Sequence, residues 1–147
     1  MADGAPALRS SVIALHLLWE VMQLPLYTIW TSGTAGQRWY AVAHCTGGDV
    51  MIAALTLLAA LAIAGSSRWP RERQSAVWLI AVVLGVGYTI FSEWLNVSVR
   101  ASWAYSTAMP TLPLIGTGLS PFAQWLIVPT LALRHALRRW PWQETDG

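Results

Sequence analysis

Acidic and imidazole side chains stand inside the apolar stretches of this chain, where ionisable groups are uncommon. They are His16, Glu20, His44, Asp49 and Glu93. A charged carboxylate in such surroundings is costly unless it is paired, so some of these groups should be protonated at neutral pH or hold a cation. Two carboxyl groups in surroundings of different polarity can serve as a proton donor and a proton acceptor. The set therefore predicts a site for acid–base chemistry.

The spacing of polar residues predicts helix faces that turn inward. Two runs have steps of four, three and four residues: His16, Glu20, Gln23 and Tyr27, and Thr89, Glu93, Asn96 and Arg100. Residues at these steps share one face of an α-helix. Between the two runs, Cys45 and Asp49 also share a face. His44 falls off that face unless Gly47 and Gly48 distort the helix.

The surroundings of each acid suggest its role. Glu20 is the more deeply placed and apolar candidate and is the expected proton donor, whereas Glu93 is the expected base, with Asp49 as its partner. Aromatic faces can flank a flat or polyene molecule and stabilise a developing carbocation. This suits isomerisation, hydration or cyclisation of a lipid-soluble substrate. The expected substrate-binding residues are Gln23, Trp94, Asn96, Trp103, Tyr105 and Gln124.

The pair of His16 and Glu20, separated by three residues, resembles a pattern in small membrane isomerases of the emopamil-binding type. The resemblance covers these residues alone. It implies an isomerase that acts on a lipid-soluble molecule.

Other functions are compatible with the same residues. Imidazole and carboxylate ligands suit zinc or iron, and His16 and Glu20 could bind one ion from one helix. No fixed metal motif is present, and the acid–base hypothesis requires no cofactor. A transport component, or a small structural subunit of a larger membrane complex, would need no chemistry at all.

Several of these residues also have a purely structural interpretation. Asp49 follows a Thr-Gly-Gly sequence and could cap a helix that begins there. Glu93 could form an ion pair with Arg100 or with Arg38. The aromatic candidates could belong to a membrane-interface belt.

The composition places the chain among membrane proteins. It has 147 residues, of which 55% are hydrophobic and 11% charged, against about 25% charged in soluble domains. Ten tryptophans also suit a membrane protein, where they gather at the interfaces. The arginines cluster at predicted helix ends and form no basic stripe, which argues against a nucleic-acid partner. The single cysteine, Cys45, excludes an internal disulfide.

Four apolar runs predict an all-α bundle of four transmembrane helices in one domain, residues 1–147. The expected spans are 8–30, 39–64, 75–97 and 120–137. Pro25 and Pro129 should kink their helices. Ser120 followed by Pro121 predicts an N-cap and first helical position. The aromatic stretch before Ser120 predicts a partly re-entrant loop over a polar pocket.

The arginines predict the orientation. Only Arg38 and Arg100 fall on one side of a four-span protein, whereas the other seven fall on the opposite side. By the positive-inside rule this is a multi-pass inner (plasma) membrane protein with both termini cytoplasmic. The polar residues of all four spans then gather in the outer half, so the pocket should open to the periplasmic side. Expected partners are the lipid bilayer, a hydrophobic small molecule, and further copies or a larger membrane complex.

Overall fold

The computed structural model of the chain describes residues 4–65 and 68–140. These residues form helices and no β-strand, which confirms the all-α prediction. The predicted interfacial tail beyond residue 140 lies outside the described residues. The elements are α1 (Gly4–Gln23), η1 (Leu24–Leu26), α2 (Ile29–Ser32), α3 (Ala35–Ala64), α4 (Gln74–Glu93), η2 (Trp94–Val99) and α5 (Leu119–Arg138).

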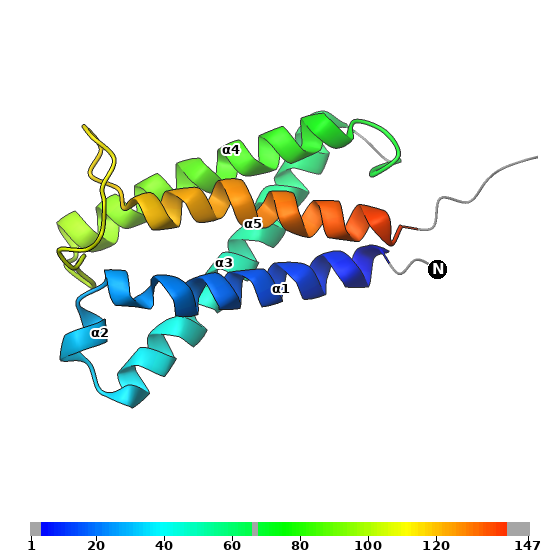
Figure 1. Cartoon of the computed structure of the whole chain (residues 1–147). Coiled ribbons are helices and arrows are strands. Elements are labelled where there is room, and N and C mark those ends of the chain that lie inside the picture. The colour runs from blue at the N-terminus through cyan, green and yellow to red at the C-terminus, as the bar shows by residue number, and fades with distance from the viewer. Residues whose placement is uncertain (1–3, 66–67, 141–147) are drawn as a thin grey trace, which may run out of the picture.

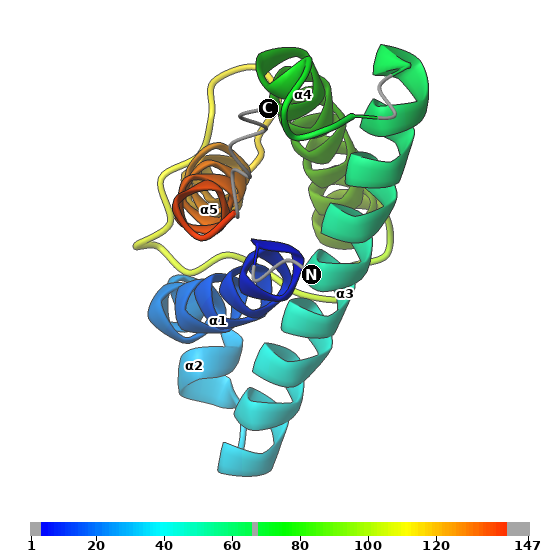
Figure 2. The ribbon, with the colours of Figure 1, turned by 90° about the vertical axis from the view of Figure 1, so that its right-hand side faces the viewer.

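The four long helices pack in a ring. Helix α1 contacts α5 and α3, and α4 contacts α3 and α5. Helices α1, α4 and α5 run nearly parallel to one another, while α3 crosses them obliquely (Figure 1). The view along the bundle shows α5 and α1 on one side and α3 on the other (Figure 2). Side chains from three or four helices can therefore meet inside the ring.

The first apolar run is not one helix, in contrast to the predicted span 8–30. Helix α1 ends at Gln23, and the chain continues through η1 and the short α2. The reason is Pro25, which has no N–H to donate to the preceding turn and disfavours helical geometry in the residue before it. The break brings the chain around a corner at residues 24–28.

Helix α3 begins four residues earlier than the predicted span 39–64, because Thr34 forms a capping box. The Thr34 hydroxyl accepts from the Gln37 backbone N–H, and the Gln37 side chain accepts from the backbone N–H of Thr34. The helix ends at Gly65, whose φ of 61° lies in the left-handed region that glycine adopts without strain. Asp49 therefore lies in the middle of α3, and its interpretation as an N-cap is wrong.

Two helices of the described residues are long and apolar enough to cross a membrane. They are α3 and the continuous segment formed by α4 and η2, Gln74–Val99. Hydrophobic side chains are widely exposed on the bundle surface. Examples on α1 are Leu17, Leu18 and Met22. In contrast, His16, Glu20 and Gln23 of the same helix are buried.

Helix α5 begins at Leu119 with Gly118 at the N-cap position, so the predicted capping role of Ser120 is wrong. The Ser120 hydroxyl is instead used in contacts with α1. Pro129 lies inside α5, which stays helical through it from Leu119 to Arg138.

The loop between η2 and α5 is attached to the corner after α1. Thr28 donates its backbone N–H to the carbonyl of Ala104 at 2.9 Å, and Ser106 donates to the carbonyl of Leu26 at 2.9 Å. Tyr27 and Tyr105 form an isolated antiparallel bridge. The loop thus covers the same end of the bundle as α2 (Figure 1).

Candidate functional site

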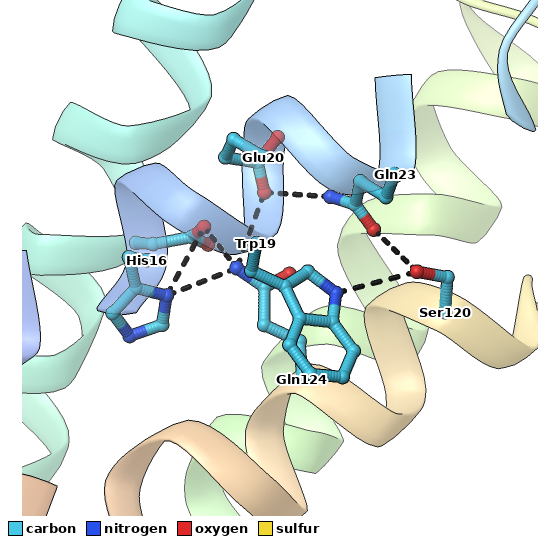
Figure 3. A network of polar contacts seen from close by, with 7 residues as sticks. His16, Trp19, Glu20, Gln23, Ser120 and Gln124 are labelled. Carbon is cyan, nitrogen blue, oxygen red and sulfur yellow. Dashed lines mark hydrogen bonds and ion pairs between the residues drawn. The ribbon is translucent and has the colours of Figure 1, made fainter. Parts of the chain in front are cut away.

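The amide nitrogen of Gln124 on α5 is the centre of a buried polar cluster. Its Nε2 atom lies 2.8 Å from Oδ2 of Asp49, 3.1 Å from Oε1 of Glu20 and 3.0 Å from Nδ1 of His16. Nδ1 of His16 is also 3.4 Å from Oδ2 of Asp49. Figure 3 shows the side chains converging from α1 and α5. We call His16, Glu20, Asp49 and Gln124 the polar cluster.

The Gln124 amide alone cannot donate a hydrogen bond to every acceptor of the polar cluster. A carboxamide has two N–H hydrogens, whereas three acceptor positions surround Nε2. If both hydrogens serve the carboxylates, Nδ1 of His16 carries its own hydrogen and donates it to Asp49. If one serves Nδ1, the hydrogen of a neutral imidazole is on Nε2. The His16 tautomer is thus coupled to the hydrogen bonds of both acids.

A second set of hydrogen bonds holds Glu20 from the other side. Gln23 donates to Oε1 of Glu20 at 2.6 Å, and its own amide oxygen accepts from the Ser120 hydroxyl at 2.9 Å. The Trp19 indole N–H donates to the same hydroxyl at 3.2 Å. These contacts join α1 to the first turn of α5 (Figure 3). They restrict the carboxyl group of Glu20 to one position.

The polar cluster is shielded from solvent. His16 is 0% exposed, Gln124 2% and Glu20 7%, while the Asp49 side chain is the most accessible at 15%. Oxygen atoms of the two carboxyl groups lie within hydrogen-bond distance of one nitrogen, so the groups repel each other when both are ionised. Among the described residues, the ion pair open to the cluster is that of His16 with Asp49, which forms only when the imidazole is protonated. The net negative charge of the polar cluster must therefore be limited by protons bound to its carboxyl and imidazole groups.

The polar cluster separates two cavities of different character. The larger cavity, of about 970 Å³, has apolar walls and polar side chains that include Glu20, Asp49 and Gln124. It reaches the aromatic loop at Trp103, and we call it the outer cavity. The inner cavity, of about 410 Å³, has an almost entirely apolar lining and reaches His16. Trp125 borders both, and its ring centroid is 5.4 Å from that of His16. One face of the cluster thus meets a cavity with mixed polar and apolar walls, and the other meets an almost entirely apolar cavity.

The third predicted acid, Glu93, lies on the outer cavity but outside the polar cluster. It is buried near the end of α4, and its Oε2 accepts a hydrogen bond from the Tyr105 hydroxyl. That hydroxyl in turn accepts from the backbone N–H of Gly118 at 2.9 Å. In the described part of the chain neither Arg38 nor Arg100 forms an ion pair with Glu93.

Burial, together with the hydrogen bond to Glu93 and the charge of its carboxylate, raises the pKa of Tyr105 above its ordinary value. The hydroxyl therefore stays protonated and able to donate. The contact ties the aromatic loop to α4.

His44 does not join the other titratable residues. Helix α3 passes through Gly47 and Gly48 without interruption, so His44 stays off the face that carries Asp49. It is exposed and stacks on Tyr40, with ring centroids 5.6 Å apart. Its imidazole borders the outer cavity but has no contact with the cluster.

The predicted substrate-binding residues other than Tyr105, which holds Glu93, divide into three groups. Gln23 and Gln124 belong to the hydrogen-bond network just described. Asn96 and Trp103 line the outer cavity. Trp94 is exposed on the bundle surface against Phe91, with ring centroids 6.0 Å apart, as a membrane-interface residue would be.

Ser120 is a structurally important residue to which the sequence prediction assigned no site role, whereas Trp125 is one of the aromatic side chains expected to flank a substrate. Ser120 and Gln124 are four residues apart, so they share a helix face, and this spacing was a usable signal. Trp125 is accommodated by Gly85, where an added Cβ would lie 2.1 Å from Cε3 of the indole. Nothing in the linear sequence indicates that Gly85 and Trp125 lie in contact.

Within residues 4–65 and 68–140, no group of three or more His, Cys, Asp or Glu side chains is arranged to hold a metal ion. Comparison of the chain with protein-family models, with curated proteins and with solved structures gives no match.

Proposed function

We propose that this protein is a four-span inner-membrane protein whose polar cluster carries out acid–base chemistry on a lipid-soluble molecule. The membrane placement is supported by the distribution of side chains. Large hydrophobic residues cover the outside of α1 and α5 as well as α3 and α4, while the acidic and amide residues are turned inward. This arrangement is expected when the surroundings are hydrocarbon, because a polar side chain facing lipid is costly.

The proposed orientation follows the arginines. The ends of α1 and α5 that carry Arg9 and Arg134 lie at the same end of the bundle as the connection between α3 and α4 (Figure 1). With this end cytoplasmic, the outer cavity opens toward the periplasm. The proposed partners are then the bilayer itself and a hydrophobic small molecule.

The observation that supports the chemistry best is the convergence of His16, Glu20 and Asp49 on one amide. A proton bound to the cluster has three acceptors among which it can move, and the two carboxyl groups differ in burial. Such a unit can deliver a proton to one atom of a substrate and accept one from another. Isomerisation, hydration and cyclisation of a double bond all need these two transfers.

The structure favours a change in the roles expected from sequence. Glu93 is held by Tyr105 outside the polar cluster, so we assign the proton transfers to His16, Glu20 and Asp49. Glu20, fixed by Gln23 and Gln124, remains the proposed donor. Glu93 is proposed to position the loop.

The reaction can be tested without a known substrate, since each of these reactions exchanges a carbon-bound hydrogen with the cluster. Membranes containing the protein are incubated in D₂O with a total lipid extract, and deuterium incorporation is followed by mass spectrometry. At least one lipid-soluble compound should gain carbon-bound deuterium in a protein-dependent manner. Glu20→Gln and Asp49→Asn should reduce that gain by at least tenfold.

Glu72→Gln is the matched control, because Glu72 is an exposed carboxylate at the far end of the bundle, paired with Arg68. It should leave the exchange unchanged. Full exchange in both Glu20→Gln and Asp49→Asn, with normal protein levels in the membrane, would refute the acid–base proposal. Glu93→Gln should reduce exchange less than either variant.

A transport role is the second candidate, favoured by the two cavities that meet at the polar cluster. Such a protein would move protons across the cluster. Proteoliposomes containing a pH-sensitive dye would then acidify faster than empty liposomes after a pH jump, and Glu20→Gln would abolish the difference. No acceleration, together with protein-dependent deuterium exchange, decides in favour of the enzyme.

A further inference from the structure

His16 has one ring nitrogen that the polar cluster does not use. Its Nδ1 faces Gln124 and Asp49. Its Nε2 is fully buried and has no hydrogen-bond partner among the described residues. A buried polar atom without a partner costs about 1–3 kcal/mol relative to one that is satisfied. The second nitrogen lies on the side of the ring away from the network (Figure 3).

The unused nitrogen belongs to a ring that lines the inner cavity, as does the Trp69 indole, whose buried N–H also has no hydrogen-bond partner among the described residues. His16 lines this cavity and is not part of the lining of the outer one. From His16 the cavity extends between Val12, Leu57, Trp78 and Leu133 toward Arg9 and Trp69. Its volume of about 410 Å³ lies within the range of small-molecule sites, about 300–1,000 Å³. At about 30 Å³ for each water-sized group, the space accommodates on the order of ten carbon atoms.

The chemistry of the nitrogen limits the ligand. With the hydrogen on Nδ1, Nε2 is an acceptor; with the hydrogen on Nε2, it is a donor. A hydroxyl group satisfies either tautomer because it both donates and accepts. A carboxylate or phosphate is disfavoured at Nε2, since the lining of the inner cavity is almost entirely apolar and an unpaired charge there is costly.

We propose that the inner cavity binds an apolar alcohol, with its hydroxyl group on Nε2 of His16 and its hydrocarbon body along the cavity. This inference rests on the proposed function and names its substrate class. It makes His16 the group that touches the substrate. Asp49, 3.4 Å from Nδ1, becomes the group that exchanges a proton with the imidazole, and Glu20 is joined to His16 through the Gln124 amide.

The binding test uses decanol as the probe and decane as its match without oxygen. The whole chain is labelled with ¹⁵N-histidine, reconstituted in phosphatidylcholine nanodiscs and titrated with each probe. The chain has three histidines, and His44 is exposed on the outer side. Decanol should shift the Nε2 resonance of His16 in a saturable manner and leave those of His44 and His135 unchanged. Decane should not reproduce the Nε2 shift.

A second measurement locates the hydrocarbon. Decanol carrying a diazirine at its far end should crosslink on illumination to residues such as Leu8, Val12 and Trp69. Ala81→Phe on α4 fills the cavity and should reduce crosslinking at least fivefold. Ala76→Phe, which is exposed on the same helix, is the control and should not. His16→Phe keeps an aromatic ring but removes Nε2, so it should weaken decanol binding to the level of decane.

Three outcomes would overturn the inference. They are equal binding of decanol and decane, a shift of all three histidines, or crosslinks that Ala81→Phe leaves unchanged. The proposed function fails separately, through unimpaired deuterium exchange in Glu20→Gln and Asp49→Asn. Decanol binding at His16 without any such exchange would support a binding site while refuting the enzyme.

Discussion

Gly85 on α4 lies directly against the indole ring of Trp125 on α5. A Cβ built on Gly85 would lie 2.1 Å from Cε3 of the indole, so no other residue fits there without a shift of the helices. Trp125 in turn packs beside His16 and borders both cavities. The absence of a side chain at Gly85 thus allows the Trp125 indole to take its position beside both cavities.

Gly85→Ala should destabilise the protein by about 1–3 kcal/mol, the usual cost of overpacking a filled interior. Gly87→Ala is the matched control, because nothing lies within 4 Å of an added Cβ there. In the control, alanine's better helix propensity should leave stability equal or slightly higher. Reversible unfolding in mixed micelles of dodecyl maltoside and SDS measures both. Equal effects of the two substitutions would mean that Trp125 is not packed on Gly85.

Gln124→Leu should be among the most destabilising substitutions in the polar cluster. It removes the shared donor from Glu20 and Asp49. Glu20 keeps the hydrogen bond from Gln23, but Oδ2 of Asp49 loses its amide donor, at a cost of about 1–3 kcal/mol. A double-mutant cycle with Glu20→Gln should show a coupling energy of at least about 0.5 kcal/mol. The same cycle with the distant Glu72→Gln should be additive. Additivity in both cycles would contradict the observed network.

Tyr105→Phe should loosen the aromatic loop, because it removes the hydrogen bond to Glu93 and the acceptor for the Gly118 N–H. Amide hydrogen exchange at Gly118 should accelerate at least tenfold. Tyr40→Phe, at an exposed position on α3, is the control and should leave this exchange rate unchanged. An unchanged rate at Gly118 in Tyr105→Phe would show that the loop is held by its backbone contacts alone.

The same tyrosine should make stability depend on pH in the alkaline range. The pKa of Tyr105 is raised in the folded protein, whereas that of an unfolded tyrosine is about 10. The folded state therefore binds the phenolic proton more tightly. The resulting stability is complete below about pH 10 and is lost as the pH rises further. In unfolding measurements the wild type should lose stability above this pH more steeply than Tyr105→Phe, and parallel curves would exclude this contribution.

The proposed orientation can be tested with cysteines placed at the two ends. In a Cys45→Ser background, Thr107→Cys lies in the exposed aromatic loop and Glu72→Cys in the exposed connection between α3 and α4. A thiol reagent that does not cross membranes should label the first in intact spheroplasts and the second in inverted vesicles. Labelling of both from one side would contradict the four-span arrangement.

Much of the site's local order was predictable from sequence. His16, Glu20 and Gln23 have helix-face spacing, and the structure buries all three on the inner face of α1. The interruption at Pro25 follows equally from local chemistry, since a proline removes a donor wherever it stands. These features depend only on residues within a few positions of one another.

The residues on other segments that each helix face contacts could not be predicted from spacing. Spacing placed Glu93 and Glu20 on equivalent faces, yet Glu20 joins Asp49 and Glu93 joins a loop tyrosine. The oblique crossing of α3 and the position of α5 decide this, and both depend on distant packing such as Gly85 against Trp125.

The sequence by itself therefore determined that this chain is helical, apolar outside and acidic at a few inward positions, because periodicity and composition act locally along the chain. Only the tertiary structure decided that Gln124 joins two of the acids to a histidine between a cavity of mixed polarity and an apolar cavity. The physical reason is that a helix fixes which residues share a face, whereas the residues opposite that face depend on how side chains from distant segments fill the same space.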